Sequence, residues 1–99
     1  NTRVIDIINE LAEYGIKPLV FDPVADKSET LAEYGFGLSD KSEIKDLDAI
    51  IVAVAHEEFI NNTAKDYKKL FSKGNVFVDV KGIYNKSEFE NEGFLYWRL

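Results

Sequence analysis

The fold class of this chain is decided by one stretch, VFVDVKG at residues 76–82. Its β-branched and aromatic residues predict a strand that is buried on both faces, as in a parallel sheet. Ligands of open parallel sheets bind just beyond the carboxyl ends of the strands, so Lys81 stands where an anionic ligand would be met. Spacing alone leaves a second reading open, in which Lys81 is a solvated side chain that opens a loop. Gly82 likewise either lets the backbone approach a ligand closely or only makes a turn.

Length and composition describe a small folded domain. A chain of 99 residues suits one domain with a single core, and we take residues 1–99 as that domain. The chain is 45% hydrophobic, which is enough apolar material for folding rather than disorder. No apolar run is long enough to span a bilayer, and no charged-then-apolar leader is present. We therefore expect a soluble protein with no membrane partner.

Charge and residue types exclude several classes of function. Twelve basic residues stand against eighteen acidic ones, a net charge of -6, which argues against the basic face that nucleic-acid binding requires. The chain has no cysteine, and this excludes a disulfide framework, a thiol nucleophile and a thiolate metal site. The single histidine, His56, leaves too few nitrogen ligands for a zinc site. We expect a protein of the reducing cytoplasm that binds no metal and no nucleic acid.

Helical and extended patterns alternate along the chain. Apolar residues recur at helical spacing in the opening segment, with Gly15 as its stop. Asp26 has the position of a helix cap, and Gly35 ends that second helix. The Lys73-Gly74 pair is expected to turn the chain into the strand that follows. We expect helices at residues 3–14, 27–34, 56–60, 64–71 and 87–91, one helical turn at 42–45, and strands at 17–21, 36–38, 49–55, 76–80 and 94–99.

This alternation predicts an α/β domain with a mainly parallel sheet and right-handed crossovers. The chain opens on a helix whose apolar face needs a sheet, yet no strand precedes it. In a doubly wound fold, the missing strand before this helix would be the central strand of the sheet. We therefore expect a fragment of a longer protein, in which exposed sheet edges favour self-association as a homo-oligomer.

Four segments carry a resemblance through their order and spacing: FDPVAD at 21–26, AVAHEEF at 53–59, FVDVKG at 77–82 and YWRL at 96–99. Together they resemble the C-terminal domain of the nucleotide-sugar 6-dehydrogenases, the family of UDP-glucose and GDP-mannose dehydrogenases. The likeness is strongest to the branch that acts on UDP-N-acetylhexosamines in polysaccharide synthesis. The opening Asn1-Thr2 is also similar to the end of the family's Asp-x-Arg-Asn-Ser/Thr segment. Nearly all 99 residues are covered.

The resemblance implies a three-layer Rossmann-like domain that lacks its first strand. The family's enzymes use NAD to oxidise the C6 alcohol of a nucleotide sugar to a carboxylate. NAD and the catalytic cysteine would belong to upstream domains, so we expect no catalytic residue here and no activity from this fragment alone. The absence of both cysteine and a G-x-G-x-x-G turn agrees with this. The C-terminal domain closes over the nucleotide half of the substrate, and its Asp-x-Lys/Arg position supplies a cation.

In this sequence that position is Lys81, and Gly82 stands beside it as the second predicted substrate-binding residue. A lysine at a strand end is a fixed point charge for the diphosphate of a UDP-sugar. Glucose-specific relatives often carry arginine here, and lysine lacks the bidentate geometry of arginine.

Other residues near strand ends have structural readings beside functional ones. His56 could transfer a proton, but we favour a helix cap or a local hydrogen bond. Asp22 has the place of a ribose-binding acid, yet without a glycine-rich turn before it we favour turn chemistry. Asp79 would pair with the nearby cation or with a backbone donor, in a structural role. Tyr96 and Trp97 are expected to be core or interface aromatics.

A stand-alone flavodoxin-like module of the receiver type is the alternative function. Such a module needs clustered acids for Mg²⁺ and a phosphate-accepting aspartate at a strand end. Asp22 offers only one acid. Mg²⁺-dependent uptake of acetyl phosphate would separate this alternative from the UDP-sugar reading.

Overall fold

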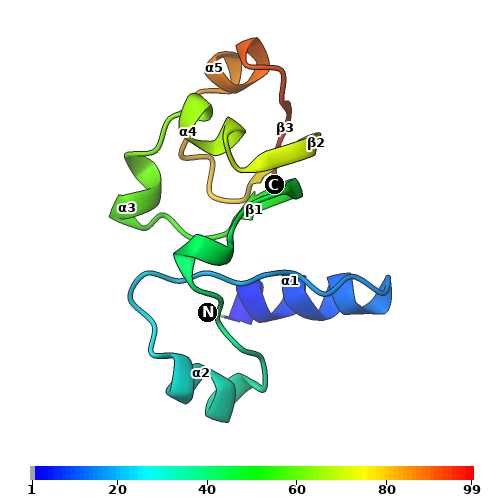
Figure 1. The fold of residues 1–99 in the computed structure, drawn as a ribbon, viewed down its shortest axis with the longest axis vertical. Coiled ribbons are helices and arrows are strands. Elements are labelled where there is room, and N and C mark those ends of the chain that lie inside the picture. The colour runs from blue at the N-terminus through cyan, green and yellow to red at the C-terminus, as the bar shows by residue number, and fades with distance from the viewer. Residues whose placement is uncertain (1) are drawn as a thin grey trace. The chain divides into compact units, whose positions relative to one another are not determined.

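The computed structural model of this chain describes residues 2–99. The chain divides into two compact units, Asn1–Ile44 (unit 1) and Lys45–Leu99 (unit 2), and each has its own architecture. The elements, labelled in Figure 1, are α1 (Thr2–Glu13), α2 (Lys27–Tyr34), the short 3-10 helix η1 (Lys41–Glu43), β1 (Leu47–Val52), α3 (Glu57–Ile60), α4 (Ala64–Lys68), β2 (Phe71–Asp79), α5 (Lys86–Asn91) and β3 (Leu95–Arg98).

Unit 2 is built on a three-stranded parallel sheet with the strand order β1-β2-β3. Helices α3 and α4 connect β1 to β2, and α5 connects β2 to β3, so each neighbouring pair of strands is joined through helix. Parallel pairing requires such crossovers, because a tight turn can join only antiparallel strands. The expected α/β class, with a parallel sheet in a Rossmann-like arrangement, is confirmed.

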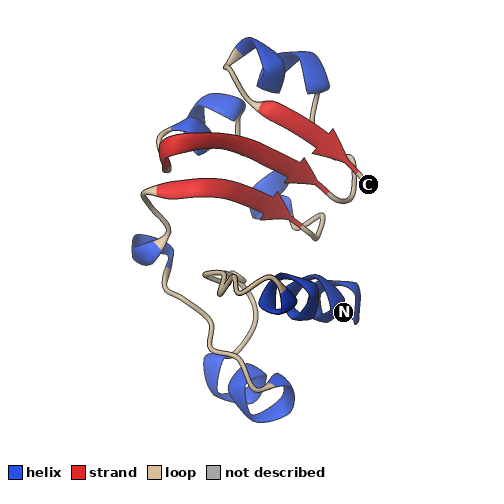
Figure 2. Ribbon diagram, turned by 90° about the vertical axis from the view of Figure 1, so that its right-hand side faces the viewer, coloured by secondary structure: helices blue, strands red, loops and turns tan. Residues whose placement is uncertain are grey.

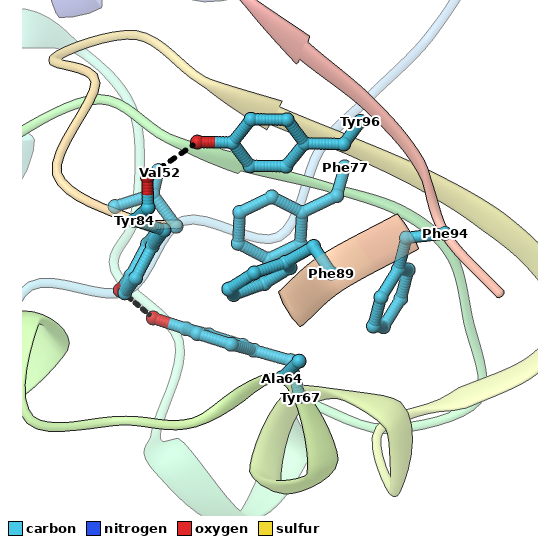
Figure 3. Close-up of a cluster of buried hydrophobic side chains, with 8 residues drawn as sticks. All are labelled: Val52, Ala64, Tyr67, Phe77, Tyr84, Phe89, Phe94 and Tyr96. Atoms are coloured by element: carbon cyan, nitrogen blue, oxygen red, sulfur yellow. Dashed lines mark hydrogen bonds between the residues drawn. The ribbon is translucent and has the colours of Figure 1, made fainter. Parts of the chain in front are cut away.

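The core of unit 2 is an aromatic cluster centred on Phe77 (Figure 3). Phe77 is paired with Ile50 on one side and Tyr96 on the other. Its ring meets Tyr67 of α4 at a centroid distance of 4.9 Å and Phe89 of α5 at 4.6 Å. Both Phe77 and Phe89 are fully buried. These ring contacts fix α4 and α5 on the same face of the sheet, since aromatic pairs at such distances add packing energy to burial.

The opposite face of the sheet carries apolar residues that stay partly exposed in this structure. Ile51, Val78 and Trp97 form one row across the three strands. Val78 is half-buried, and Trp97 is 62% exposed. The predicted burial of the 76–80 strand on both faces is therefore complete only on the Phe77 face, where the helices of unit 2 pack.

One irregularity lengthens β2 beyond the predicted strand. Leu47 pairs with Phe71 and Ala49 with Val76, so the register shifts between these two pairs. A Cβ atom at Gly74 would lie 1.9 Å from the carbonyl oxygen of Asp48. Because only glycine allows this approach, the predicted Lys73-Gly74 turn is instead an irregular part of β2.

Unit 1 confirms the two long helices and their ends. Gly15 and Gly35 have φ angles of 76° and 79° after α1 and α2, the left-handed conformation that ends helices. The side chain of Asp26 accepts a hydrogen bond from the backbone N–H of Glu29 at 2.9 Å, as expected of a cap.

Two predicted strands of unit 1, residues 17–21 and 36–38, are not formed. The Ser39 N–H donates to the Val20 carbonyl at 2.7 Å, but no strand ladder continues from this bond. Pro18 has no N–H to give to a ladder, and Pro23 ends the extended stretch. The apolar pattern was read correctly as extended chain and wrongly as paired strand.

Candidate functional site

The carboxyl ends of all three strands lie at one edge of the sheet, as the arrowheads in Figure 2 show. Val52, Asp79 and Arg98 are paired across this edge. Lys81 and Gly82, the two predicted substrate residues, follow β2 with only Val80 between. Polar groups from neighbouring strands therefore gather where ligands of open parallel sheets bind.

Asp79 anchors the loop that follows β2. Its carboxylate is fully buried and accepts hydrogen bonds from the backbone N–H groups of Ile83 at 3.1 Å and Tyr84 at 2.9 Å. The hydroxyl of Tyr96 donates a third hydrogen bond to it. A buried carboxylate is tolerated only when such donors satisfy it. The expected structural role, with backbone donors as partners, is confirmed, and residues 80–84 are tied to the strand end.

Lys81 and Gly82 form the exposed part of this anchored loop. The Lys81 side chain is exposed, and Gly82 has a φ angle of 66°. A Cβ atom at Gly82 would meet only Cδ of Arg98, at 3.9 Å, so the backbone angle and not crowding requires glycine here. The turn alone accounts for Gly82, and ligand contact by either residue stays a prediction.

Arg98 is the charged residue of this edge that sequence reasoning did not assign. Its Nε donates to the hydroxyl of Tyr96 at 3.2 Å, and its Nη2 donates to the carbonyl oxygen of Tyr84 at 2.6 Å. The hydrogen bond with Tyr96 raises the pKa of Arg98 above its ordinary value, with a further contribution from Asp79. The sequence did contain a signal for Arg98. It is a cation at the end of the last predicted strand, and the strand before it is followed by Lys81.

Hydrogen bonds between tyrosine hydroxyls also hold the loop that follows β2. Tyr84 donates to the carbonyl oxygen of Phe59. This leaves Tyr67 as the donor to Tyr84 in their mutual hydrogen bond (Figure 3). Burial raises the pKa values of Tyr67, Tyr84 and Tyr96 above the ordinary value for tyrosine. The three hydroxyls stay protonated and act as donors, so α3, α4 and the loop are joined by fixed polar contacts.

Three of the remaining candidates, His56, Asp22 and Tyr96, have the structural roles that the sequence favoured. His56 caps α3, its Nδ1 accepting from the backbone N–H of Glu58 at 3.1 Å. Asp22 in unit 1 accepts from the N–H groups of Val24 at 2.9 Å and Ala25 at 3.1 Å, which is turn chemistry. Tyr96 is a core aromatic, as expected. Trp97 is 62% exposed and is therefore not a core residue, so its place at an interface stays a prediction.

Residues 2–99 hold no group of three or more His, Cys, Asp or Glu side chains that could bind a metal ion. Within the same residues, every helix is too short or too polar to cross a membrane.

Comparison with known proteins gives a consistent result. Residues 1–86 match the family described as "UDP-glucose/GDP-mannose dehydrogenase family, UDP binding domain". The chain is 41% identical over 99 residues to Protein CapL of Staphylococcus aureus, covering 100% of this chain and 23% of the relative. It is 39% identical over 88 residues to UDP-N-acetyl-D-glucosamine 6-dehydrogenase of Pseudomonas aeruginosa, covering 89% and 21%. The Salmonella typhi enzyme of the same name is 40% identical over 83 residues, covering 82% and 19%.

No solved structure matches the chain. The chain spans about a fifth of the length of these curated relatives, and it matches their C-terminal part.

The three-stranded parallel sheet and its helical crossovers define an α/β domain of the Rossmann-like type. The chain belongs to the UDP-glucose/GDP-mannose dehydrogenase family and represents its UDP-binding C-terminal domain. This membership decides against the receiver-type alternative.

Proposed function

We propose that this chain binds the nucleotide half of a UDP-sugar within an NAD-dependent nucleotide-sugar 6-dehydrogenase. The substrate of the whole enzyme is a UDP-N-acetylhexosamine or UDP-glucose, which is oxidised at C6 to the uronate for polysaccharide synthesis. The names of two relatives, UDP-N-acetyl-D-glucosamine 6-dehydrogenases, support the first of these substrates.

The observation that carries this proposal is the placement of Lys81. The residue is exposed beyond the carboxyl end of the central strand, in a loop that the buried Asp79 ties down. A lysine held on such a loop presents its ammonium group to a diphosphate with little loss of backbone freedom on binding. A charge-assisted hydrogen bond of this kind is worth about 1.5–3 kcal/mol.

The hydride chemistry belongs to residues outside this chain. NAD accepts hydride from the sugar carbon when it is bound, but these residues offer no glycine-rich strand-to-helix turn to hold it. Residues 1–99 supply binding and no catalytic group, and by themselves they turn over no substrate.

The whole enzyme is a homo-oligomer of the cytoplasm that binds neither nucleic acid nor membrane. The net charge of -6 of residues 1–99 supports the first exclusion for this part of the enzyme, since phosphate backbones require a basic face. Exposed apolar residues on the outer sheet face, such as Leu95 and Trp97, support burial against other protein surface.

Calorimetric titration with UDP tests the binding proposal, using the gene product that contains these residues. Lys81→Gln removes the charge at an exposed position, so folding is preserved and affinity for UDP falls about tenfold or more. The matched control is Lys73→Gln, because Lys73 is exposed like Lys81 but lies on β2 near the amino end of the strand.

Equal weakening by both lysine variants would show a general charge effect and would contradict the placement of UDP at Lys81. Absence of UDP binding by the unmodified protein would overturn the proposed function itself. Oxidation of UDP-N-acetylglucosamine and UDP-glucose with NAD, followed at 340 nm, then distinguishes the two sugar substrates.

A further inference from the structure

Arg98 lies directly beside the loop that carries Lys81. Asp79, the last residue of β2, is paired with Arg98, the last residue of β3. A Cβ atom built at Gly82 would lie 3.9 Å from Cδ of Arg98. The aliphatic part of the arginine therefore runs next to the turn, and two cationic residues stand at the ends of neighbouring strands.

The guanidinium of Arg98 is held in place and remains charged. It donates to Tyr96 and Tyr84, as described above, and its central carbon lies 5.6 Å from the centroid of the Tyr96 ring. Within residues 2–99, Arg98 forms no ion pair with a carboxylate. The hydrogen bond from Tyr96 to Asp79 links the guanidinium indirectly to the buried acid. Its position is thus fixed while its charge is not neutralised by direct contact.

An open cavity of about 600 Å³ borders the guanidinium. It is lined by Tyr84, Asn85, Lys86, Ser87, Glu90 and Arg98. An arginine has five N–H groups, and two of those of Arg98 are used within the protein. The other N–H groups are available for the oxygens of a phosphate, which arginine recognises in bidentate geometry.

We infer that Arg98 is a second cation for the diphosphate of the UDP-sugar and acts together with Lys81. This inference rests on the proposed function, because it concerns the same ligand and the same sheet edge. Lys81 supplies a point charge, and Arg98 supplies the rigid fork of donors that lysine lacks. The pair thus gives this chain the bidentate contact that its Asp-x-Lys sequence alone would not provide.

Arginine footprinting tests this inference on the unmodified gene product that contains the chain. Phenylglyoxal modifies accessible guanidinium groups, and mass spectrometry follows the peptides that carry Arg3 and Arg98, the two arginines of this sequence. Both side chains are exposed, and Arg3 in unit 1 is the internal control. We expect saturating UDP to slow the modification of Arg98 several-fold and to leave that of Arg3 unchanged.

Calorimetry on two variants provides the second measurement. Arg98→Gln lowers the affinity for UDP about tenfold or more, and Arg98→Lys, which keeps the charge but not the fork, gives an intermediate loss. If UDP binding depends on Lys81 while Arg98 is neither protected nor required, the inference fails and the proposed function stands. If UDP does not bind at all, both fail. Should Arg98→Gln not fold, protection of Arg98 in the unmodified protein decides the outcome.

Discussion

Units 1 and 2 use the same helix signals but differ in what they bury. Asp26 caps α2 by accepting from Glu29 N–H at 2.9 Å, and Asn85 caps α5 by accepting from Glu88 N–H at 3.0 Å. Yet among residues 3–99 every fully buried side chain belongs to unit 2. Residues 3–44 reach half-burial at most.

The difference comes from the parallel sheet. A helix buries one stripe of side chains, and it needs a second layer to bury that stripe against. In unit 2 the aligned residues Ile50, Phe77 and Tyr96 form a broad apolar row on which α4 and α5 pack. Unit 1 has two α-helices and the 3-10 helix η1 but no strand ladder among its described residues. Local signals therefore specify helices in both units, while pairing of strands creates the core.

The largest effect on stability is expected from removing the central aromatic ring of the unit 2 core, and it tests the contrast between the two units. Phe77→Ala should reduce the free energy of unfolding by about 3–5 kcal/mol, because a fully buried phenylalanine leaves a cavity. Leu31→Ala in unit 1 should change it by less than about 0.5 kcal/mol, since Leu31 is 56% exposed. Urea unfolding followed by far-UV circular dichroism measures both, and Trp97 fluorescence reports on unit 2 separately. Similar losses for the two variants would break the contrast.

The same distinction explains which parts of the fold could be predicted from sequence. Caps and stops at Asp26, Gly35 and His56 were predicted because their chemistry involves neighbouring residues. The strands at residues 17–21 and 36–38 were wrong because β pairing depends on a partner that local pattern does not reveal. The Lys73-Gly74 turn was wrong for a related reason: Gly74 is required by the approach of Asp48 from another strand.

At the candidate site, the sequence predicted that Lys81 follows a strand end and that Asp79 is structural, but it did not predict the contacts that side chains of β3 make there. Asp79 was expected to have a structural role, and a strand-end rule was enough to locate Lys81. The hydrogen bond from Tyr96 to Asp79 joins β3 to β2 across 17 residues in sequence. Arg98 donates in turn to Tyr96 within β3. Such a network follows only from the register of the two strands.

A pair of glycine substitutions gives a test of intermediate size. Gly74→Ala should destabilise unit 2 by about 1–3 kcal/mol, because the added methyl group would overlap the Asp48 carbonyl unless β1 and β2 move apart. At Gly37 in unit 1, a Cβ atom would meet nothing within 4 Å. Gly37→Ala should therefore stabilise by about 0.4–1 kcal/mol through the unfolded state. Urea midpoints measure both, and a loss at Gly37 as large as that at Gly74 would contradict close packing as the cause.

The smallest effect is expected from removing the two matched helix caps. Asp26→Ala and Asn85→Ala should each cost about 1 kcal/mol of helix stability, because each leaves a backbone N–H without its acceptor. The consequences should differ, since α2 has no buried residue whereas Phe89 fixes α5 in the core. Amide hydrogen exchange should therefore show α2 opening freely in Asp26→Ala and α5 remaining protected in Asn85→Ala. If α5 instead loses its protection as fully as α2 does, then the cap and not the buried ring holds that helix, and the contrast between the units would need another cause.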